Sequence, residues 1–175
     1  MNTKKLTTIA MLTALYVVLA ILTPIRLQHF KFTFEALPIL VTGFIFGHKA
    51  GLLVATLGSF IYQLFFSGYG FTATTILWII PHSISGLTVG YLSERKDFNL
   101  EKKDILMISL LSSFTVTLLN TLALFIDSKI YGYYSIALVF STIPLKILTG
   151  IILAFAYCFI IVPLMAKVDQ LNLRK

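Results

Sequence analysis

"IALVFSTIPLKILTGIILAFAYCFIIVPLMA" occupies Ile136–Ala166, and this stretch decides the class of the fold. A helix needs about 20 apolar residues to cross a bilayer, and this run is longer than that. One charged residue, Lys146, stands near its middle. A charge at such depth is costly, so intramembrane lysines are rare and usually functional. We therefore predict a membrane helix in which Lys146 serves a ligand, with snorkelling towards the bilayer surface as the alternative.

The rest of the chain has the same apolar character. Of its 175 residues, 58% are hydrophobic and only 12% are charged, and the mean hydropathy is +0.92. A soluble domain of this size could not cover so much apolar side chain with polar surface. The alternating pattern of a membrane β-barrel does not recur. The sequence thus predicts an all-α membrane protein, with one transmembrane domain over residues 1–175.

Six apolar segments are predicted to be transmembrane helices. The last is expected to bend near Pro144 or to end near Pro163, because proline interrupts a helix. We interpret the first as a retained helix and not a signal peptide, since it shows no small-residue cleavage pattern. The six segments are Leu6–Thr23, Glu35–Gly47, Ala50–Phe66, Thr74–Leu92, Ile105–Ile126 and Ile136–Ala166.

The distribution of lysine and arginine predicts the orientation. With a cytoplasmic N-terminus, ten of these residues fall inside and only three, Arg26, Lys31 and Lys129, fall outside. This bias is typical of membrane proteins, so we expect both termini in the cytoplasm of a multi-pass protein of the bacterial cell membrane. The same placement explains the net charge of +7 without a nucleic-acid partner.

Uncommon polar residues gather towards the outer side of the predicted helices. At about 1.5 Å per residue, Lys146 lies near the midplane and the others lie nearer the outer face. The external loops add aromatic and cationic side chains. This asymmetry predicts a pocket open to the outside, with the loops as lids. The candidate substrate-binding residues are Arg26, Gln63, Tyr69, Trp78, His82, Asn120 and Lys146.

Some of these residues also have a structural interpretation. Tyrosine and tryptophan at helix ends often anchor a protein at the membrane interface, and Arg26 could contact lipid phosphate. Asn120 could hydrogen-bond a neighbouring helix. His82 could bond the carbonyl that Pro81 leaves free. Glu35, at a helix start, could act as a capping acid.

The chain lacks the motifs of an enzyme or an ATPase. It contains no G-x-x-x-x-G-K-[ST], H-E-x-x-H or G-x-S-x-G sequence. Cys158 is its single cysteine, so neither an internal disulfide nor a multi-cysteine metal site is available. We expect no catalytic residue, no metal and no cofactor. We therefore predict that this six-helix protein, which has an outward pocket and no energy source, depends on a partner protein to supply the energy.

Three stretches resemble one family of membrane proteins. They are "IAMLTAL" at residues 9–15, "FKFTFEALPILVTGFIFGHKAGLLVATLGSFIYQL" at Phe30–Leu64 and "WIIPHSISGLTVGYLSERK" at Trp78–Lys96. They are similar to the substrate-binding S component of energy-coupling factor (ECF) transporters. In the first stretch, Ala10 and Ala14 lie four residues apart, which lets another helix approach closely.

The resemblance implies that one subunit binds the substrate and other subunits supply the energy for uptake. The S component would bind a small water-soluble vitamin from outside. Ala10 and Ala14 would form the surface that docks on a transmembrane coupling subunit, which is carried by two ATPase subunits. The entry "F.F..LPI" to the second helix suggests a pantothenate or folate type. The alternative is a stand-alone secondary transporter for a small anionic metabolite, which would need a polar path through the inner half.

Overall fold

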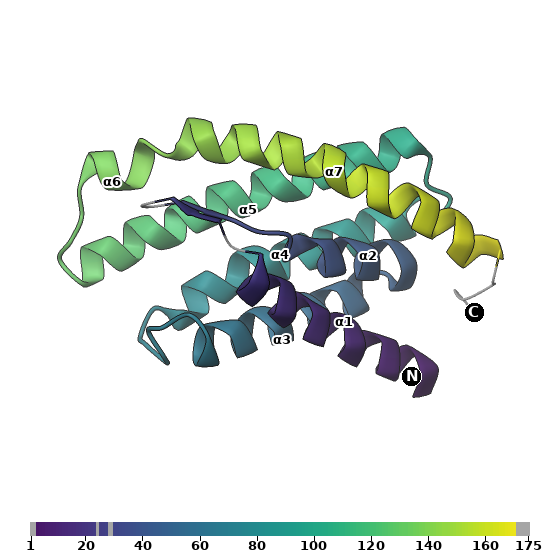
Figure 1. Cartoon of the computed structure of the whole chain (residues 1–175), viewed down its shortest axis with the longest axis horizontal. Helices are drawn as coiled ribbons and strands as arrows, with labels where there is room; N and C mark the ends of the chain where they lie inside the picture. The colour runs from purple at the N-terminus through teal and green to yellow at the C-terminus, as the bar shows by residue number, and fades with distance from the viewer. Residues whose placement is uncertain (1–2, 24, 28–29, 171–175) are drawn as a thin grey trace.

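The computed structural model describes residues 3–23, 25–27 and 30–170, which form a helical bundle with one short β-ribbon (Figure 1). Both ends of the chain lie at the same end of the bundle. In chain order the elements are α1 (Thr3–Leu22), β1 (Ile25–Leu27), β2 (Phe30–Phe32), α2 (Ala36–Phe46), α3 (His48–Phe65), α4 (Thr75–Glu94), α5 (Lys102–Ile130), α6 (Ile136–Phe140) and α7 (Ile143–Gln170).

Each of the six segments predicted to be helical is helical. The fifth begins earlier than predicted, because the side chains of Glu101 and Asp104 form a reciprocal capping box at the start of α5. The sixth segment is interrupted between α6 and α7, just before Pro144, where a bend was expected. Pro163 lies inside α7, so the alternative of a helix that ends there is wrong.

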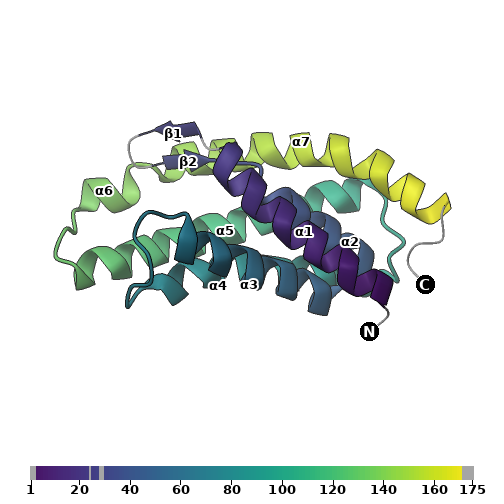
Figure 2. The ribbon, with the colours of Figure 1, turned by 60° about the horizontal axis from the view of Figure 1, so that its bottom comes forward.

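The prediction of an all-α chain missed the ribbon between α1 and α2. Strand β1 pairs with β2 in the antiparallel sense, and Arg26 stands opposite Lys31. Strands of three residues are too short to show a period of two in the sequence, so a loop was expected there. Figure 2 shows the ribbon in the half of the molecule that also contains α6, away from the two chain ends.

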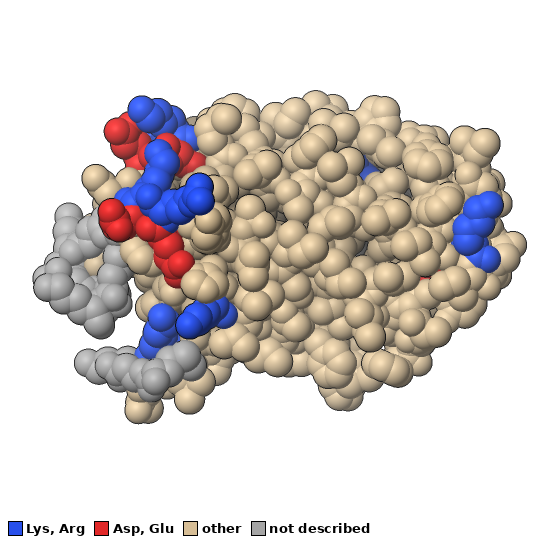
Figure 3. All heavy atoms as spheres, turned by 180° about the vertical axis from the view of Figure 1, so that it is seen from behind, with Lys and Arg blue, Asp and Glu red and all other residues tan. Residues whose placement is uncertain are grey.

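Four helical segments of the described chain are long and apolar enough to cross a membrane: Lys5–Leu22, Thr75–Glu94, Lys102–Ile130 and Ile136–Val168. Charged residues gather at the end of the molecule that carries the termini (Figure 3). A smaller basic group lies at the opposite end, and the face between them is almost uncharged. This distribution suits a protein whose middle lies in hydrocarbon and whose ends lie in water.

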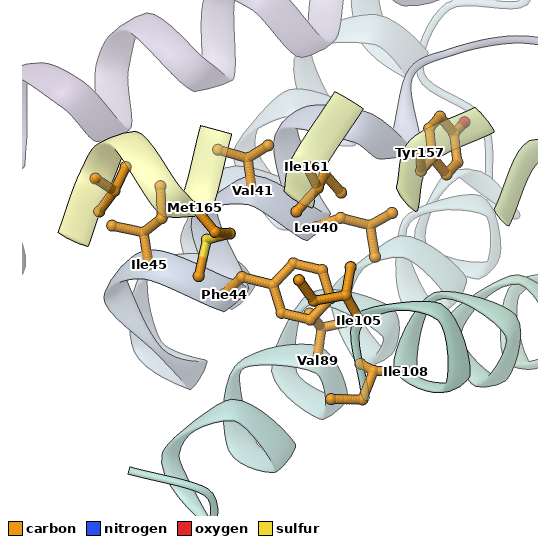
Figure 4. Packing of buried hydrophobic residues seen from close by; sticks show 11 residues of the cluster. Leu40, Val41, Phe44, Ile45, Val89, Ile105, Ile108, Tyr157, Ile161 and Met165 are labelled. Carbon is orange, nitrogen blue, oxygen red and sulfur yellow. The ribbon is translucent and has the colours of Figure 1, made fainter. Parts of the chain in front are cut away.

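Helix α2 forms the centre of the bundle. Every residue from Pro38 to Ile45 is buried, as expected for a short helix that is apolar on all sides. Phe44 is fully buried and packs with residues of α4, α5 and α7 (Figure 4). The buried members of this cluster are Leu40, Val41, Phe44, Ile45, Val89, Ile105, Ile108, Tyr157, Ile161, Met165 and Val168.

Glycines let α3 and α4 approach each other closely. A Cβ atom at Gly86 would lie 2.3 Å from the carbonyl oxygen of Gly51, and one at Gly51 would lie 2.5 Å from the carbonyl oxygen of Gly86. Such contacts leave no room for any larger residue. The two helices therefore form a tightly packed wall, and this wall supports one side of the site described next.

Candidate functional site

A cavity of about 890 Å³ lies among the helices, and its size is that of a site for a small organic molecule. Its wall includes side chains from α1, α3, α4, α5 and α7, from the segment that precedes α2, and from the loops after α3 and α5. Along α5 the lining runs from Ser109 to Asp127, roughly 27 Å at about 1.5 Å per residue.

The mouth of the cavity is built around Asp127, near the end of α5. Its side chain is buried, and it accepts hydrogen bonds from the hydroxyls of Thr74 and Tyr133. This contact, the Asp127 clasp, joins the start of α4 to the loop between α5 and α6. Burial and the bond to Asp127 raise the pKa of Tyr133, so its hydroxyl stays protonated. Tyr69 is 85% exposed and completes the aromatic rim.

The middle of the cavity combines a cation, an amide and an indole. Lys146 comes from the first turns of α7, Asn120 from α5 and Trp78 from the first turn of α4. Lys146 is half-buried. Among the salt bridges of the described residues, none involves this lysine. Together these groups provide hydrogen-bond donors beside an aromatic face.

The deep end contains an acid and an imidazole. Oε1 of Glu35 lies 3.8 Å from Nε2 of His82, and both side chains are largely buried. The ring of Tyr16 stands edge-on to that of His82, with their centroids 5.7 Å apart. Tyr157 donates from its hydroxyl to the backbone oxygen of Thr33 at 3.2 Å. This bond fixes the segment that carries Glu35 against α7.

The structure agrees only in part with the interpretation of Glu35 as a capping acid. The residue does occupy the N-cap position of α2, but its side chain makes no capping hydrogen bond. It lines the cavity instead, beside His82. Position at a helix start alone could not distinguish these two roles, because both place a carboxylate near the first turn.

A row of small polar residues on α5 forms another part of the wall. Ser109, Ser112, Ser113 and Thr117 all line the cavity. The hydroxyl of Ser112 lies 2.6 Å from that of Ser85 on α4. These residues were not predicted from the sequence, although their spacing of three to four marks one helix face. The other cavity residues that were not predicted are Tyr16, Tyr62, Thr74, Asp127, Tyr133 and Tyr157.

Most of the residues predicted from sequence meet in this one cavity. Those that line it are Gln63, Tyr69, Trp78, His82, Asn120 and Lys146. Arg26 lies in β1, and its side chain is outside the described part of the structure, so its role stays a prediction. Ala10 and Ala14 are exposed on α1 and are not among the lining residues.

Comparison with solved structures supports the same architecture. The S component of a bacterial ECF transporter matches with a TM-score of 0.69 and 21% identity, over 96% of this chain and 99% of that one. The S component for biotin from an ECF-type ABC transporter matches with a TM-score of 0.65 and 16% identity, over 91% and 94%. At these identities the likeness shows the fold alone. No curated protein sequence matches the chain significantly.

A family model gives the more specific result. The model of the ECF-type riboflavin transporter S component matches residues 1–168, which is nearly the whole chain. The resemblance noted in the sequence is thereby confirmed at the level of the S component. By this match, the chain belongs to the ECF-type riboflavin transporter S component family.

Proposed function

We propose that this protein captures a water-soluble vitamin outside the cell and delivers it to an energising module for uptake. One observation carries the proposal: in a chain of the S-component family, six residues chosen for their polarity converge on a single cavity. The family is one of transporter components and not of enzymes, so binding and release are its expected work.

We infer that the vitamin is riboflavin. The family model names this vitamin, and the cavity offers suitable chemistry. Riboflavin has a flat ring system with a carbonyl-bearing edge and a chain of hydroxyl groups. Trp78 supplies an aromatic face, and Lys146 and Asn120 supply donors for carbonyl oxygens. Pantothenate and folate, the two types suggested by the sequence, stay predictions and serve as competitors below.

The proposed orientation has both termini in the cytoplasm and six crossings of the bacterial cell membrane. Charged residues gather at the end of the molecule that carries the two chain termini. This supports the orientation, because cytoplasmic ends of membrane proteins are rich in lysine and arginine. The Asp127 clasp lies at the other end of α5 and would face the outside. The mouth of the cavity would then open to the outside of the cell, where the vitamin is taken up.

The proposed partners are a transmembrane coupling subunit and two ATPase subunits. Ala10 and Ala14 support the contact because both are exposed on α1, whereas Ile9, Thr13 and Tyr16 on the same helix are buried. Small exposed side chains at a spacing of four let a partner helix come close. Hydrolysis of ATP by the partner would supply the energy that this chain cannot provide.

Ligand binding by the purified chain tests the proposal directly. Flavin fluorescence should be quenched as riboflavin enters a cavity lined by Trp78 and several tyrosines. Native mass spectrometry of the purified chain should also detect any vitamin that is retained. Excess pantothenate or folate should leave the quenching unchanged. Quenching reversed by either competitor would assign the cavity to that vitamin, and the absence of any quenching would refute riboflavin.

Transport assays separate the proposal from a stand-alone secondary transporter. Vesicles that contain only this chain should bind riboflavin and accumulate none, with or without a proton gradient. Vesicles that also contain the coupling subunit and both ATPases should accumulate it when ATP is supplied. Accumulation by the chain alone would overturn the requirement for an energising module.

A further inference from the structure

A second, smaller hollow lies between α5 and α7, on the outside of the bundle. Its volume is about 190 Å³, and none of its described lining residues is charged. Its large side chains are partly exposed, with exposed fractions of 49% for Phe114, 42% for Ile151 and 37% for Ile147. We call this hollow the α5–α7 groove. Its lining residues are Leu110, Ser113, Phe114, Thr117, Ile147, Gly150 and Ile151.

The floor of the groove is made of small residues that also line the cavity. Ser113, Thr117 and Gly150 belong to both linings, whereas the large apolar residues of the groove belong to the groove alone. Gly150 is buried, and a Cβ atom placed on it would lie 2.3 Å from Oγ of Ser113. The two helices therefore touch along this floor. A single layer of small residues separates the cavity from the outside of the bundle here.

The groove lies near the middle of two membrane-spanning segments. Both Lys102–Ile130 and Ile136–Val168 are long and apolar enough to cross a membrane. On α5 the groove begins at Leu110, about 12 Å after the helix starts, and ends at Thr117, about 20 Å before the helix ends. The hydrocarbon core of a bilayer is about 30 Å thick, so the groove faces acyl chains and not headgroups.

The size and polarity of the groove determine what can fill it. An empty groove loses dispersion contacts, because its lining has no atoms opposite. Water needs two to four polar partners, which the apolar sides of the groove do not offer. A helix with its side chains is about 10–12 Å wide and is too large for a hollow of 190 Å³. A single flexible hydrocarbon chain satisfies both limits.

We propose that the α5–α7 groove binds one acyl chain of a membrane phospholipid, and that this chain closes the cavity wall from the membrane side. The inference goes beyond the capture of a vitamin, because it assigns a second class of ligand to a second site. The chain is held by its contacts with Leu110, Phe114 and Ile151, above the floor that the groove shares with the cavity.

Two phenylalanines give a matched comparison for a labelling experiment. Phe114 lines the groove and Phe155, on α7, does not, although each side chain is 49% exposed. The protein is placed in phosphatidylcholine vesicles that contain a small fraction of a phospholipid with a diazirine in the middle of one acyl chain. After illumination, peptide mass spectrometry measures the lipid attached to each phenylalanine. Phe114 should be labelled about 3- to 10-fold more strongly, the factor that several additional van der Waals contacts give.

Ile151→Trp should remove this preference, because the larger side chain fills the groove without reaching the residues that line only the cavity. Ile152→Trp is the matched control: Ile152 is the next residue, is 53% exposed and lines neither hollow. It should leave the labelling ratio of Phe114 to Phe155 unchanged. Thermal unfolding in detergent reports whether each variant folds. Should Ile151→Trp fail to fold, Leu110→Phe fills the groove from α5 and decides the question.

Three results would overturn the proposal. The first is equal labelling of Phe114 and Phe155 in the wild-type protein. The second is a preference for Phe114 that persists in both Ile151→Trp and Leu110→Phe. The third is unlabelled Phe114 in a dimer that Ile151→Trp dissociates, observed by native mass spectrometry, which would assign the groove to a second copy of the chain. No vitamin is present in this experiment, so its failure would leave the proposed function intact.

Discussion

Lys146 is a charged residue within the apolar segment Ile136–Val168, and its position in the cavity wall accounts for this. It is half-buried in the wall of the cavity, together with Asn120 and Trp78, and not on the outer surface of the bundle. A lysine kept at this depth is expensive unless a ligand or a partner uses it. The proposed contact with a vitamin would account for the cost of burying Lys146.

Lys146→Met should therefore weaken riboflavin binding. Methionine keeps the length and apolar stem of the side chain but removes the donor, so the loss should be about 1.5–3 kcal/mol for a charge-assisted hydrogen bond. Lys129→Met is the control: Lys129 is exposed, lies 3.9 Å from the centre of the Tyr134 ring and does not line the cavity. Titration by fluorescence quenching gives both affinities. Unchanged affinity in Lys146→Met would remove its assigned role.

At the scale of elements, the Asp127 clasp joins α4 to the loop after α5. It makes the rim of the cavity depend on a single buried carboxylate that accepts from Thr74 and Tyr133. The raised pKa of Tyr133 means that its phenol is protonated in the folded protein at pH values where a free phenol begins to ionise. The contribution of the clasp is therefore fully present below about pH 10 and is lost only as pH rises through the raised pKa.

Tyr133→Phe should speed the release of riboflavin by about 3- to 10-fold, the effect of one lost hydrogen bond on a rim that must open. Tyr131→Phe is the control, because Tyr131 lies on the same rim and its side chain makes no bond to Asp127 among the hydrogen bonds of the described residues. The backbone N–H of Tyr131 donates to the backbone oxygen of Asp127, and the substitution keeps that bond. Stopped-flow fluorescence at about pH 6 and about pH 9 should give the same ratio between wild type and Tyr133→Phe. A ratio that changes between these values would contradict the raised pKa.

The glycine contact between α3 and α4 makes a prediction about stability. Gly86→Ala places a Cβ atom against the backbone of Gly51, which cannot move aside as a flexible side chain would. Overpacking of this kind costs about 1–3 kcal/mol, so the thermal midpoint should fall by several degrees. Leu87→Ala, at an exposed neighbouring position, should leave the midpoint nearly unchanged. Equal midpoints for Gly86→Ala and wild type would show that the wall is loosely packed.

The elements also show which features the sequence could predict. Long apolar runs bounded by prolines and charges marked the six helical segments, because the bilayer demands that length and polarity. Gln63, His82, Asn120 and Lys146 were found because such polar residues are rare in membrane helices. Ser109 and Ser112 were missed, since serine in a membrane helix can equally bond its own backbone. The depth of the cavity therefore exceeded the prediction of a pocket confined to the outer half.

At the scale of the whole molecule, the two proposed activities use separate parts of the bundle. The cavity lies among α1, α3, α4, α5 and α7, whereas Ala10 and Ala14 lie on the exposed side of α1. Tyr16, on the opposite side of α1, closes the deep end of the cavity. Under these proposals, α1 would have one face for the ligand and another for a partner. Substitutions on the two faces should then have different effects.

Ala10→Trp and Ala14→Arg should abolish uptake while leaving the affinity for riboflavin within about 2-fold of wild type. A large side chain on the exposed face blocks close helix approach but does not reach the cavity. Ala166→Trp is the matched control, because Ala166 is an exposed alanine in the last turns of α7. The end of α7 lies at the same end of the molecule as the start of α1 (Figure 1). Uptake into vesicles with the full module, measured beside binding by the isolated chain, separates the two effects. Normal uptake by Ala10→Trp would place the docking surface elsewhere, and equal loss of uptake in Ala166→Trp would show that any bulky residue at this end disturbs assembly.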